Sequence, residues 1–470
     1  MKKGIISALL LTSVANAQTQ LERAIGDPVE FDNQPQKVKF LETENRIAKI
    51  APTYTVPMNN NITLAEQINQ AVFTQQWGVL PALLNRYQQQ SNYDEVLYHY
   101  AWGAWHYAQQ NHERAIFHYK AMLTLNPSLI YPRFDFGAIL FEDRQYKQAE
   151  FTLKQVYSQL DPSLKPVVLS YLNAIEAQQD WQPYLHFQYV QTDNVNNASS
   201  SKTVNINGRH FVKDPSALPQ KARGIRYAAG VEKQVNIMDN HFTKFALDYN
   251  GVYYWNNRSY NEQSVRLTLG YAQRYARSHW EVLPFVEQNW LGSPRYSRYT
   301  GVSFQQAYQF KSNWRWSNSA TVLQKYYADR LTASRYNGRQ FSFSSRLSWS
   351  LSEQWQMFVA VGGNQDRVKE LASSSDKWQL DLGTFHKIKK WNGMFTIRVG
   401  KRPFKAAHYL YGYKRKDKEY NFYASLWHEH LNWNGFTPKL NFRYQKIDSN
   451  IPDFYSRKSA EWFVTIDKLF

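Results

Sequence analysis

The C-terminal part of this chain, from Tyr184 to Phe470, alternates apolar and polar side chains with a period of two. In residues 341–351 every apolar side chain falls on one face and is interleaved with Ser and Arg. This period predicts β-strands that have one apolar face. Each alternating segment runs for about 11 to 13 residues, which is long enough for a tilted strand to cross a bilayer.

We expect about 14 such strands, and an even number is typical of bacterial outer-membrane barrels. They are predicted near residues 184–193, 223–234, 242–255, 262–273, 279–290, 299–310, 314–327, 338–351, 355–366, 376–388, 393–402, 418–428, 437–448 and 457–470.

The connections between these segments alternate in length. The second, fourth, sixth, eighth and tenth are short, as at residues 236–240, 311–313 and 352–354, whereas the first (194–222) and the eleventh (403–417) are long. Outer-membrane barrels have short periplasmic turns and longer external loops, so this parity predicts a barrel with both chain ends in the periplasm. A soluble β-sandwich is the alternative, but its strands average about five or six residues.

The last expected strand carries a candidate signal for the barrel-insertion machinery, because its apolar face ends on an aromatic ring. That face consists of Trp462, Val464, Ile466 and Phe470. Lys468 interrupts it. Because Lys468 lies close to the end of the strand, its ammonium group can reach the lipid headgroups while its aliphatic side chain stays in apolar surroundings.

Aromatic residues make up 16% of the chain, which contains no Cys. Belts of Tyr and Trp at the two membrane interfaces account for such a fraction, and a carbohydrate-binding or merely aromatic-rich β protein is the alternative. Without Cys, a lipid-modified Cys, disulfides and thiolate chemistry are excluded. The net charge of +18 is spread along the chain and favours outer-membrane lipids or an acidic passenger over nucleic acid.

The first residues predict export. Lys2 and Lys3 precede an apolar run and an Ala15-Asn16-Ala17 cleavage site, so we expect a signal peptide over residues 1–17. Residues 18–62 are polar and contain four Pro, which indicates a flexible periplasmic extension. After the signal, no apolar run reaches the roughly 18 residues that a membrane-spanning helix needs.

Between residues 63 and 180 the period is helical, and a repeat appears. Gly103 recurs as Gly137 and Ala115 as Ala149, each pair 34 residues apart. With Pro127 closing the first unit, this pattern resembles the tetratricopeptide repeat. Small residues at these positions let the two helices of a hairpin touch, and Pro stops the second helix. We expect a degenerate unit near residues 63–90 and a capping helix near 166–178.

Stacked repeats of this kind present a concave face. Four aromatic residues of the first helices are predicted to line a groove for an extended or partly folded polypeptide: Tyr100, Tyr107, Phe134 and Phe141. The alternative is that these rings pack between adjacent repeats.

The barrel interior is predicted to be charged. By alternation, six arginines point inward: Arg226, Arg266, Arg346, Arg398, Arg402 and Arg443. Five carboxylates do the same: Glu232, Asp248, Glu281, Glu287 and Asp381. Such charges indicate water or a polar passenger in the lumen, and the alternative is that they form pairs that brace the wall.

Motifs for catalysis or metal binding are not evident. His428-Glu429-His430 falls in an expected periplasmic turn, and His112-Glu113 lacks a second His four positions later. No Gly-rich phosphate loop or nucleophile elbow is present. We expect a protein that is not an enzyme and that holds no cofactor and no metal.

The junction between the halves, residues 181–185 (Trp-Gln-Pro-Tyr-Leu) leading to residues 192–198 (Thr-Asp-Asn-Val-Asn-Asn-Ala), resembles the surface lipoprotein assembly modulator (Slam) family. The likeness extends from about Thr63 to Phe470. It implies an outer-membrane translocon that moves a lipoprotein, or a soluble haem-capturing protein, to the cell surface. Partners would be that passenger, the barrel-assembly machinery and periplasmic chaperones.

Two other functions remain open from the residues. An exopolysaccharide exporter also joins helical repeats to a barrel, although usually with a longer repeat array. A passive porin, or an assembly scaffold whose repeats only recruit partners, would need no passenger.

Overall fold

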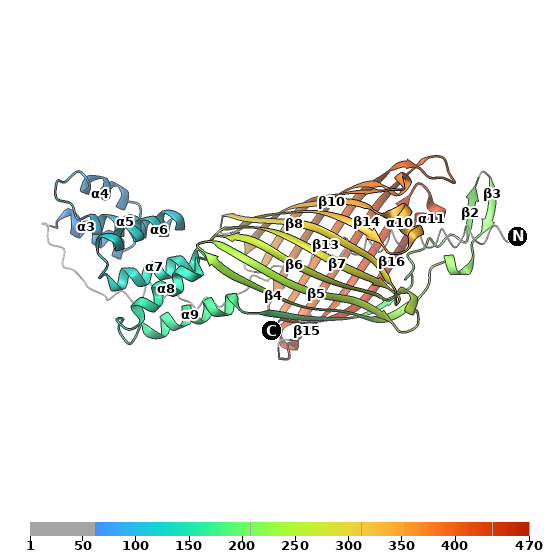
Figure 1. Ribbon diagram of the computed structural model, residues 1–470. Helices are drawn as coiled ribbons and strands as arrows, with labels where there is room; N and C mark the ends of the chain where they lie inside the picture. Colours follow the sequence, from blue (N-terminus) through green and yellow to red (C-terminus); the bar gives the residue numbers. More distant parts are fainter. Residues whose placement is uncertain (1–61, 207, 312, 353, 435, 470) are drawn as a thin grey trace.

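The computed structural model describes residues 62–206, 208–311, 313–352, 354–434 and 436–469. It contains a group of helices followed by a long β-barrel (Figure 1). The predicted signal peptide, residues 1–17, lies outside the described residues, as does the predicted extension apart from Ile62.

The helical part consists of three antiparallel hairpins and a last helix. Their bounds are α3 (Leu64–Phe73), α4 (Leu80–Tyr87), α5 (Glu95–Ala108), α6 (His112–Leu125), α7 (Ile130–Glu142), α8 (Tyr146–Tyr157) and α9 (Lys165–Gln179). Several of these helices begin with a polar N-cap residue, whose side-chain oxygen accepts hydrogen bonds from the first free N–H groups of the helix. Thr63 and Glu66 form a reciprocal capping box, and Asp94 and Asn111 cap α5 and α6. Within the described residues, no helix combines the length and apolar character needed to cross a membrane.

The 34-residue repeat is visible in the local geometry. The backbone takes a left-handed conformation at Gln110 (φ 58°) and again at Arg144 (φ 68°), each after the first helix of a hairpin. A Cβ on Gly103 would lie 2.7 Å from the Tyr119 ring, and one on Gly137 would lie 2.8 Å from Leu153. The small residues therefore stand where two helices touch.

The partner positions on the second helices are equally tight. Ala115 and Ala149 are completely buried, and Pro127 follows directly after the C-cap of α6.

The barrel is closed and antiparallel, with 14 strands in sequence order and β1 joined to both β4 and β16. This is the fold class expected from the sequence. The strands are β1 (Gln182–Thr192), β4 (Ala222–Met238), β5 (His241–Tyr254), β6 (Glu262–Arg274), β7 (Ser278–Leu291), β8 (Arg295–Lys311), β9 (Trp314–Tyr327), β10 (Gly338–Ser352), β11 (Trp355–Val368), β12 (Ser375–Ile388), β13 (Trp391–Ala407), β14 (Lys414–His428), β15 (Thr437–Ser449) and β16 (Arg457–Leu469).

Apolar side chains cover the outside of this barrel, because successive residues of a strand point to opposite faces. On β6, Leu267 and Leu269 are exposed on the outer face, whereas Thr268 between them is buried on the inner face. The same alternation holds on β11 for Val359, Ala360 and Val361.

The connections at the end away from the helices contain structure that the period of two did not predict. The first holds a separate hairpin, β2 (Thr203–Ile206) with β3 (Arg209–Val212), and the last holds α11 (Pro452–Tyr455). A helix α10 (Arg330–Tyr336) joins β9 to β10. The prediction of a long eleventh connection over residues 403–417 is wrong. β13 and β14 both extend into this range and leave only residues 408–413 between them.

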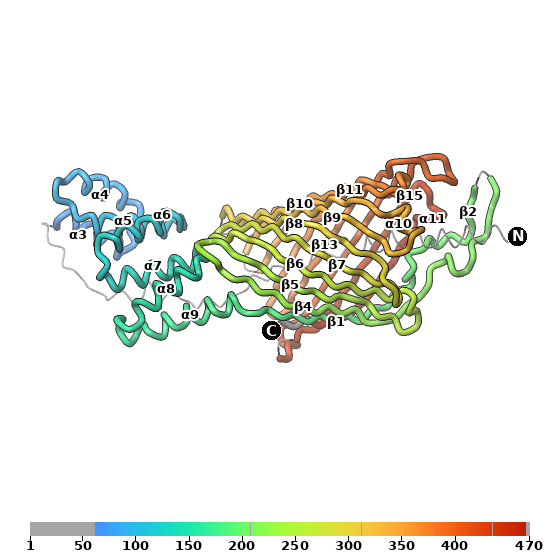
Figure 2. The backbone as a smooth tube through the Cα atoms, in the orientation of Figure 1, coloured from blue at the N-terminus to red at the C-terminus, as the bar shows by residue number. Residues whose placement is uncertain are grey.

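The helices lie at one end of the barrel and continue directly into its wall. Figure 2 shows α9 leading into β1, with α7 and α8 beside the turns of the neighbouring strands. Because β16 ends at the same end as β1 begins, both ends of the barrel segment lie next to the helical repeats.

Candidate functional site

Two of the rings predicted to line a groove are in the packed interior of the repeats. Phe134 and Phe141 on α7 are 7% and 2% exposed. Their ring centroids lie 6.3 and 5.2 Å from that of Tyr171 on α9. The last helix covers them, so their placement on an open groove is corrected: they pack between repeats.

The other two rings, Tyr100 and Tyr107 on α5, are half-buried and face a carboxyl group of α7. The Tyr107 hydroxyl donates a 2.7 Å hydrogen bond to Glu142. Burial raises the pKa of Asp135 to about 7. Burial, together with the charge of Asp135, raises the pKa of Tyr100 to about 12. What remains of the predicted groove is two half-buried tyrosines beside two carboxyl groups of α7, those of Glu142 and Asp135.

A stack of histidine rings joins α5 to α6. The Nδ1 atoms of His99 and His118 are 2.9 Å apart, and the ring of His106 stacks on that of His118 at 5.4 Å. Burial, then the neighbours His99, His106 and Arg114, lower the pKa of His118 to about 4. The neutral rings can therefore share one proton between facing nitrogens. In the part of the chain that the structure describes, no cluster of His, Cys, Asp or Glu is suited to a metal ion.

The two histidine motifs found in the sequence lie apart from each other. His428 caps a short 3-10 turn, Glu429–Leu431, at the repeat end of the barrel, and His430 within that turn contacts Lys390. His112 instead lies in the repeats, where its Nε2 is 3.2 Å from a carboxylate oxygen of Glu142.

The repeats are fixed to the barrel through the turns after β4 and β6. The amide of Lys147, on α8, donates a 2.9 Å hydrogen bond to Asn236 Oδ1. Gln179, at the end of α9, accepts a 2.9 Å hydrogen bond from the amide of Asn236. The ring of Tyr146 meets that of Phe242 edge to face at 5.8 Å, so the apolar core of the repeats continues onto the barrel.

Asn240 is the centre of this junction. Its Nδ2 donates to the carbonyl of Asp143 at 2.5 Å and to the carbonyl of Arg274 at 2.7 Å, and it is 6% exposed. The Asp143 carboxylate also accepts from the amide of Ala276 at 3.3 Å. One buried Asn thus joins the α7–α8 turn to two barrel turns. The sequence offered no signal for this role, since Asp143 and Asn240 are ordinary turn residues.

The predicted lumen arginines face the interior, and several are paired. Arg398 binds Asp381 with two hydrogen bonds, at 2.7 and 3.1 Å, and Arg266 lies 2.5 Å from Glu287. Arg402 and Lys377 both form ion pairs with the carboxylate of Glu419, each at an N–O distance of 2.7 Å.

The remaining arginines lie over aromatic rings or line the barrel cavity. Arg346 lies 4.4 Å above the ring of Phe358, and Arg443 lies 5.2 Å above that of Phe463. Arg226 lines a cavity inside the barrel.

Three of the predicted carboxylates have partners near the repeat end. Glu281 binds Arg274 at 3.2 Å, Glu232 binds Lys244 at 3.2 Å, and Asp248 accepts a 2.7 Å hydrogen bond from Tyr184.

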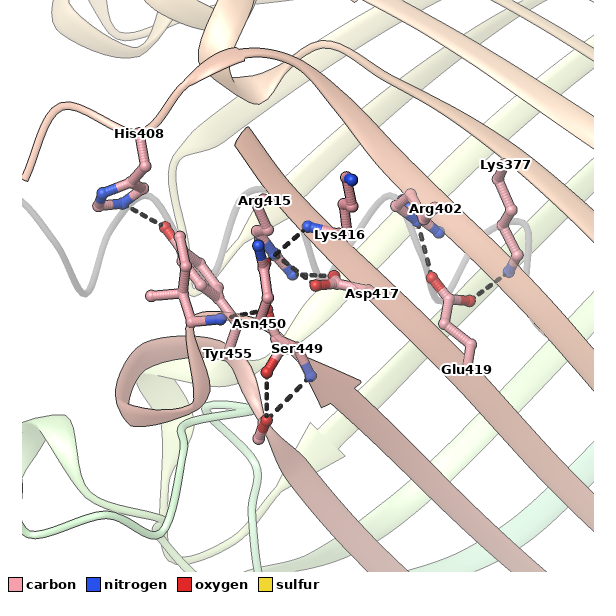
Figure 3. Close-up of polar contacts among 12 residues, drawn as sticks. Lys377, Arg402, His408, Arg415, Lys416, Asp417, Glu419, Ser449, Asn450 and Tyr455 are labelled. Carbon is pink, nitrogen blue, oxygen red and sulfur yellow. Dashed lines mark hydrogen bonds and ion pairs between the residues drawn. The ribbon is translucent and has the colours of Figure 1, made fainter. Parts of the chain in front are cut away.

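A second group of polar contacts braces the end of the barrel away from the repeats (Figure 3). Arg415 binds Asp417 at 2.5 Å and lies 3.5 Å above the ring of Tyr455, whose hydroxyl is 3.0 Å from His408 Nε2. Burial and the charge of Arg415 lower the pKa of His408 to about 4. The sequence period placed Arg415 outside the predicted strand, so this cluster was missed.

The last strand presents its apolar face outward. Trp462, Val464 and Ile466 are 64%, 43% and 42% exposed on the barrel surface, while Phe463 between them is buried inside. Phe470 lies outside the described residues.

Comparison with known proteins decides the family. The model for "Surface lipoprotein assembly modifier" matches residues 181–470, and the model for "Surface lipoprotein assembly modifier, N-terminal TPR repeats" matches residues 57–153. The chain belongs to the surface lipoprotein assembly modifier family. The resemblance drawn from the junction residues is confirmed, and the barrel is an outer-membrane barrel with the repeats at its periplasmic end.

Relatives cover most of the chain. The surface lipoprotein assembly modifier of Pasteurella multocida is 28% identical, over 75% of this chain and 72% of that protein. Surface lipoprotein assembly modifier 1 of Haemophilus influenzae is 25% identical, over 93% and 91%. The hemophilin secretion modulator of Acinetobacter baumannii is 23% identical, over 86% and 84%.

Among solved structures, a bacterial polysaccharide outer membrane secretin aligns with 61% of this chain and 98% of its own, at 12% identity and a TM-score of 0.34. That likeness is too distant to bear on function.

Proposed function

We propose that this protein moves a surface lipoprotein, or a related soluble haem-binding or metal-acquisition protein, across the outer membrane to the cell surface. Residues 63–180 form the receiving domain in the periplasm, and residues 181–470 form the barrel that passes the passenger. Family membership supports the class of passenger, since the relatives are named for surface lipoproteins and for hemophilin.

The observation that carries the proposal is the fixed junction at Asn240. It holds the repeats against the periplasmic turns of β4–β5 and β6–β7, through buried hydrogen bonds and a shared apolar core. A polypeptide bound to the repeats is therefore held at the mouth of the barrel, where its effective concentration is high.

The charged interior suits a polypeptide more than an apolar solute. Arg398 with Asp381, and Arg402 with Glu419, leave a wall of fixed charges and hydrogen-bonding groups that an unfolded chain can contact on its way through. Transport by this route requires no catalytic step, no metal and no cofactor. Barrel-assembly machinery, periplasmic chaperones and outer-membrane lipids are the further partners that the proposal includes.

The test is surface display in intact cells. The full chain is coexpressed with an epitope-tagged exported lipoprotein or haem-binding protein encoded nearest to its gene, and external protease is added. We expect the tag to be cleaved only when the chain is present. Equal protection of the tag with and without the chain would overturn the proposal.

The same cells distinguish the other functions. Small-solute flux without any change in the tag would indicate a porin, and loss of secreted polymer on deletion would indicate a polysaccharide exporter.

A further inference from the structure

The seam between the first and last strands is paired over only half of β1. Pairing with β4 runs the full length of β1, from Gln182 opposite Glu232 to Thr192 opposite Ala222. Pairing with β16 runs only from Tyr184 opposite Leu469 to Gln188 opposite Thr465.

The unpaired half is the one away from the repeats. If the β1–β16 pairing continued in the same register, Tyr189 would face Val464 and Thr192 would face Glu461. The structure describes all four residues, and they do not pair in this way. On its other edge, β16 stays paired with β15 from Asp467 to Arg457.

A cavity lies at this unpaired half. It is lined from β1 by Val190 and Thr192, and from β16 by the consecutive residues 457–459 and by Glu461. Residues 457–459 begin β16 and, in the same register, lie beyond the last residue of β1, so the cavity borders the outer end of this edge. The cavity also reaches the lumen residues Arg226 and Arg398. It therefore joins the barrel interior to the open edge of β16.

The unpaired segment is fixed at both ends, so it is a slot rather than a frayed terminus. The five-residue ladder closes it on the periplasmic side. On the outer side, the connection after β1 is fastened to α11 through Asp453, which accepts hydrogen bonds from Ser201 at 3.2 Å and from the amide of Asn205 at 3.1 Å. Lys213 also bonds to the Asp453 carbonyl. In Figure 1, α11 and the β2–β3 hairpin lie together at that end.

The chemistry of the slot defines its occupant. A strand edge that pairs with no neighbouring strand presents backbone N–H and C=O groups, and such groups are costly wherever lipid rather than water surrounds them. An extended polypeptide supplies alternating acceptors and donors and can add to the edge as a strand. The lining is also basic. Lys377 pairs with Glu419 and Arg398 with Asp381. Beyond these two pairs, the described lining has more cationic than acidic side chains: Arg226, Arg443, Arg457 and Lys458 with Glu461. It suits a segment that carries carboxylates.

We propose that an extended, acidic segment of the exported passenger docks in this slot by pairing with the edge of β16 between Lys458 and Val464. This proposal rests on the proposed function and adds where the passenger is held in the barrel. A phospholipid or glycolipid headgroup would match the cations, but it does not supply donors and acceptors that alternate at the spacing of a strand.

A disulfide lock tests the slot, because the chain contains no Cys. In the tagged coexpression cells, Tyr189→Cys with Val464→Cys closes the slot by extending the register. The control, Phe187→Cys with Ile466→Cys, locks positions that are already paired. We expect the oxidised slot lock to lower surface display of the tag at least tenfold, with recovery on reduction, while the control stays within twofold of the unmodified chain.

A second measurement identifies the occupant directly. Gln191, on the part of β1 that faces the slot, is replaced by the photo-crosslinking residue p-benzoylphenylalanine, and the control position is Leu267 on β6, which pairs on both sides. We expect an adduct that carries the passenger tag from position 191 and none from position 267. A second pair of variants, Arg457→Gln with Lys458→Gln, should lower the yield of that adduct severalfold.

The outcomes separate the two proposals. If the unmodified chain displays the tag, but the slot lock has no effect or position 191 captures only lipid, the slot proposal is overturned and the proposed function stands. If the unmodified chain does not display the tag, the proposed function fails and the slot proposal fails with it.

Discussion

Replacing Asn240 with Ala should release the repeats from the barrel. The Nδ2 group has two hydrogens, which satisfy the buried carbonyls of Asp143 at 2.5 Å and Arg274 at 2.7 Å. Removing them costs the two hydrogen bonds and leaves buried acceptors without partners, which amounts to about 2 to 3 kcal/mol. The undocked population should therefore rise roughly 30- to 150-fold.

Hydrogen exchange followed by mass spectrometry measures this change, since local opening exposes amides in proportion to the opened population. We expect faster exchange in peptides covering the α7–α8 turn and the β4–β5 turn, with no change in β10–β12. Asn313→Ala, in the turn between β8 and β9, is the matched control. Unchanged exchange at both junction peptides in Asn240→Ala would refute the energetic role assigned to this residue.

Three further predictions concern packing and charge. Gly137→Ala should destabilise the repeats by about 1 to 3 kcal/mol, because its Cβ would meet Leu153 at 2.8 Å, and thermal unfolding followed by helical circular dichroism measures it. Arg398→Ala should destabilise the barrel by about 3 to 5 kcal/mol by leaving Asp381 buried without its partner, and the temperature at which the folded band disappears in a detergent gel reports it. Burial raises the pKa of Asp135 to about 7. Between about pH 4 and pH 7 the carboxyl group is therefore protonated in the folded chain and ionised in the unfolded chain. The free energy of unfolding falls as pH rises through that range. Asp135→Asn should therefore stabilise the repeats by about 1 to 2 kcal/mol at pH 8 and much less at pH 4, and equal gains at both pH values would contradict the assignment.

The barrel was predictable because its period of two repeats in every strand. One face must be apolar to meet lipid, so alternation gives the strand positions and the inward side of Arg398 and Arg443 together. The limits of the strands were less predictable. β13 and β14 continue as a paired ribbon past their last pairs with β12 and β15. The sequence of this ribbon lacks the regular alternation, so the residues around Arg415 resemble a loop.

The repeat positions were predictable for a similar reason, since only small residues fit where two helix backbones meet. The surface of the repeats was not. The 34-residue period places Phe134 and Phe141 on first helices, but it carries no information on whether another helix covers them, and α9 does. The junction at Asn240 and the half-paired seam depend on contacts between segments that are far apart in sequence, which no local pattern encodes.

The central claim is that the chain itself carries a passenger across a membrane. The most direct measurement uses the purified full chain in liposomes, with the tagged passenger supplied unfolded on the side of the repeats and protease added afterwards on that side. We expect a protected, full-length passenger inside these liposomes and none inside liposomes that hold an unrelated porin. Equal protection in the two preparations, or none in either, would contradict it.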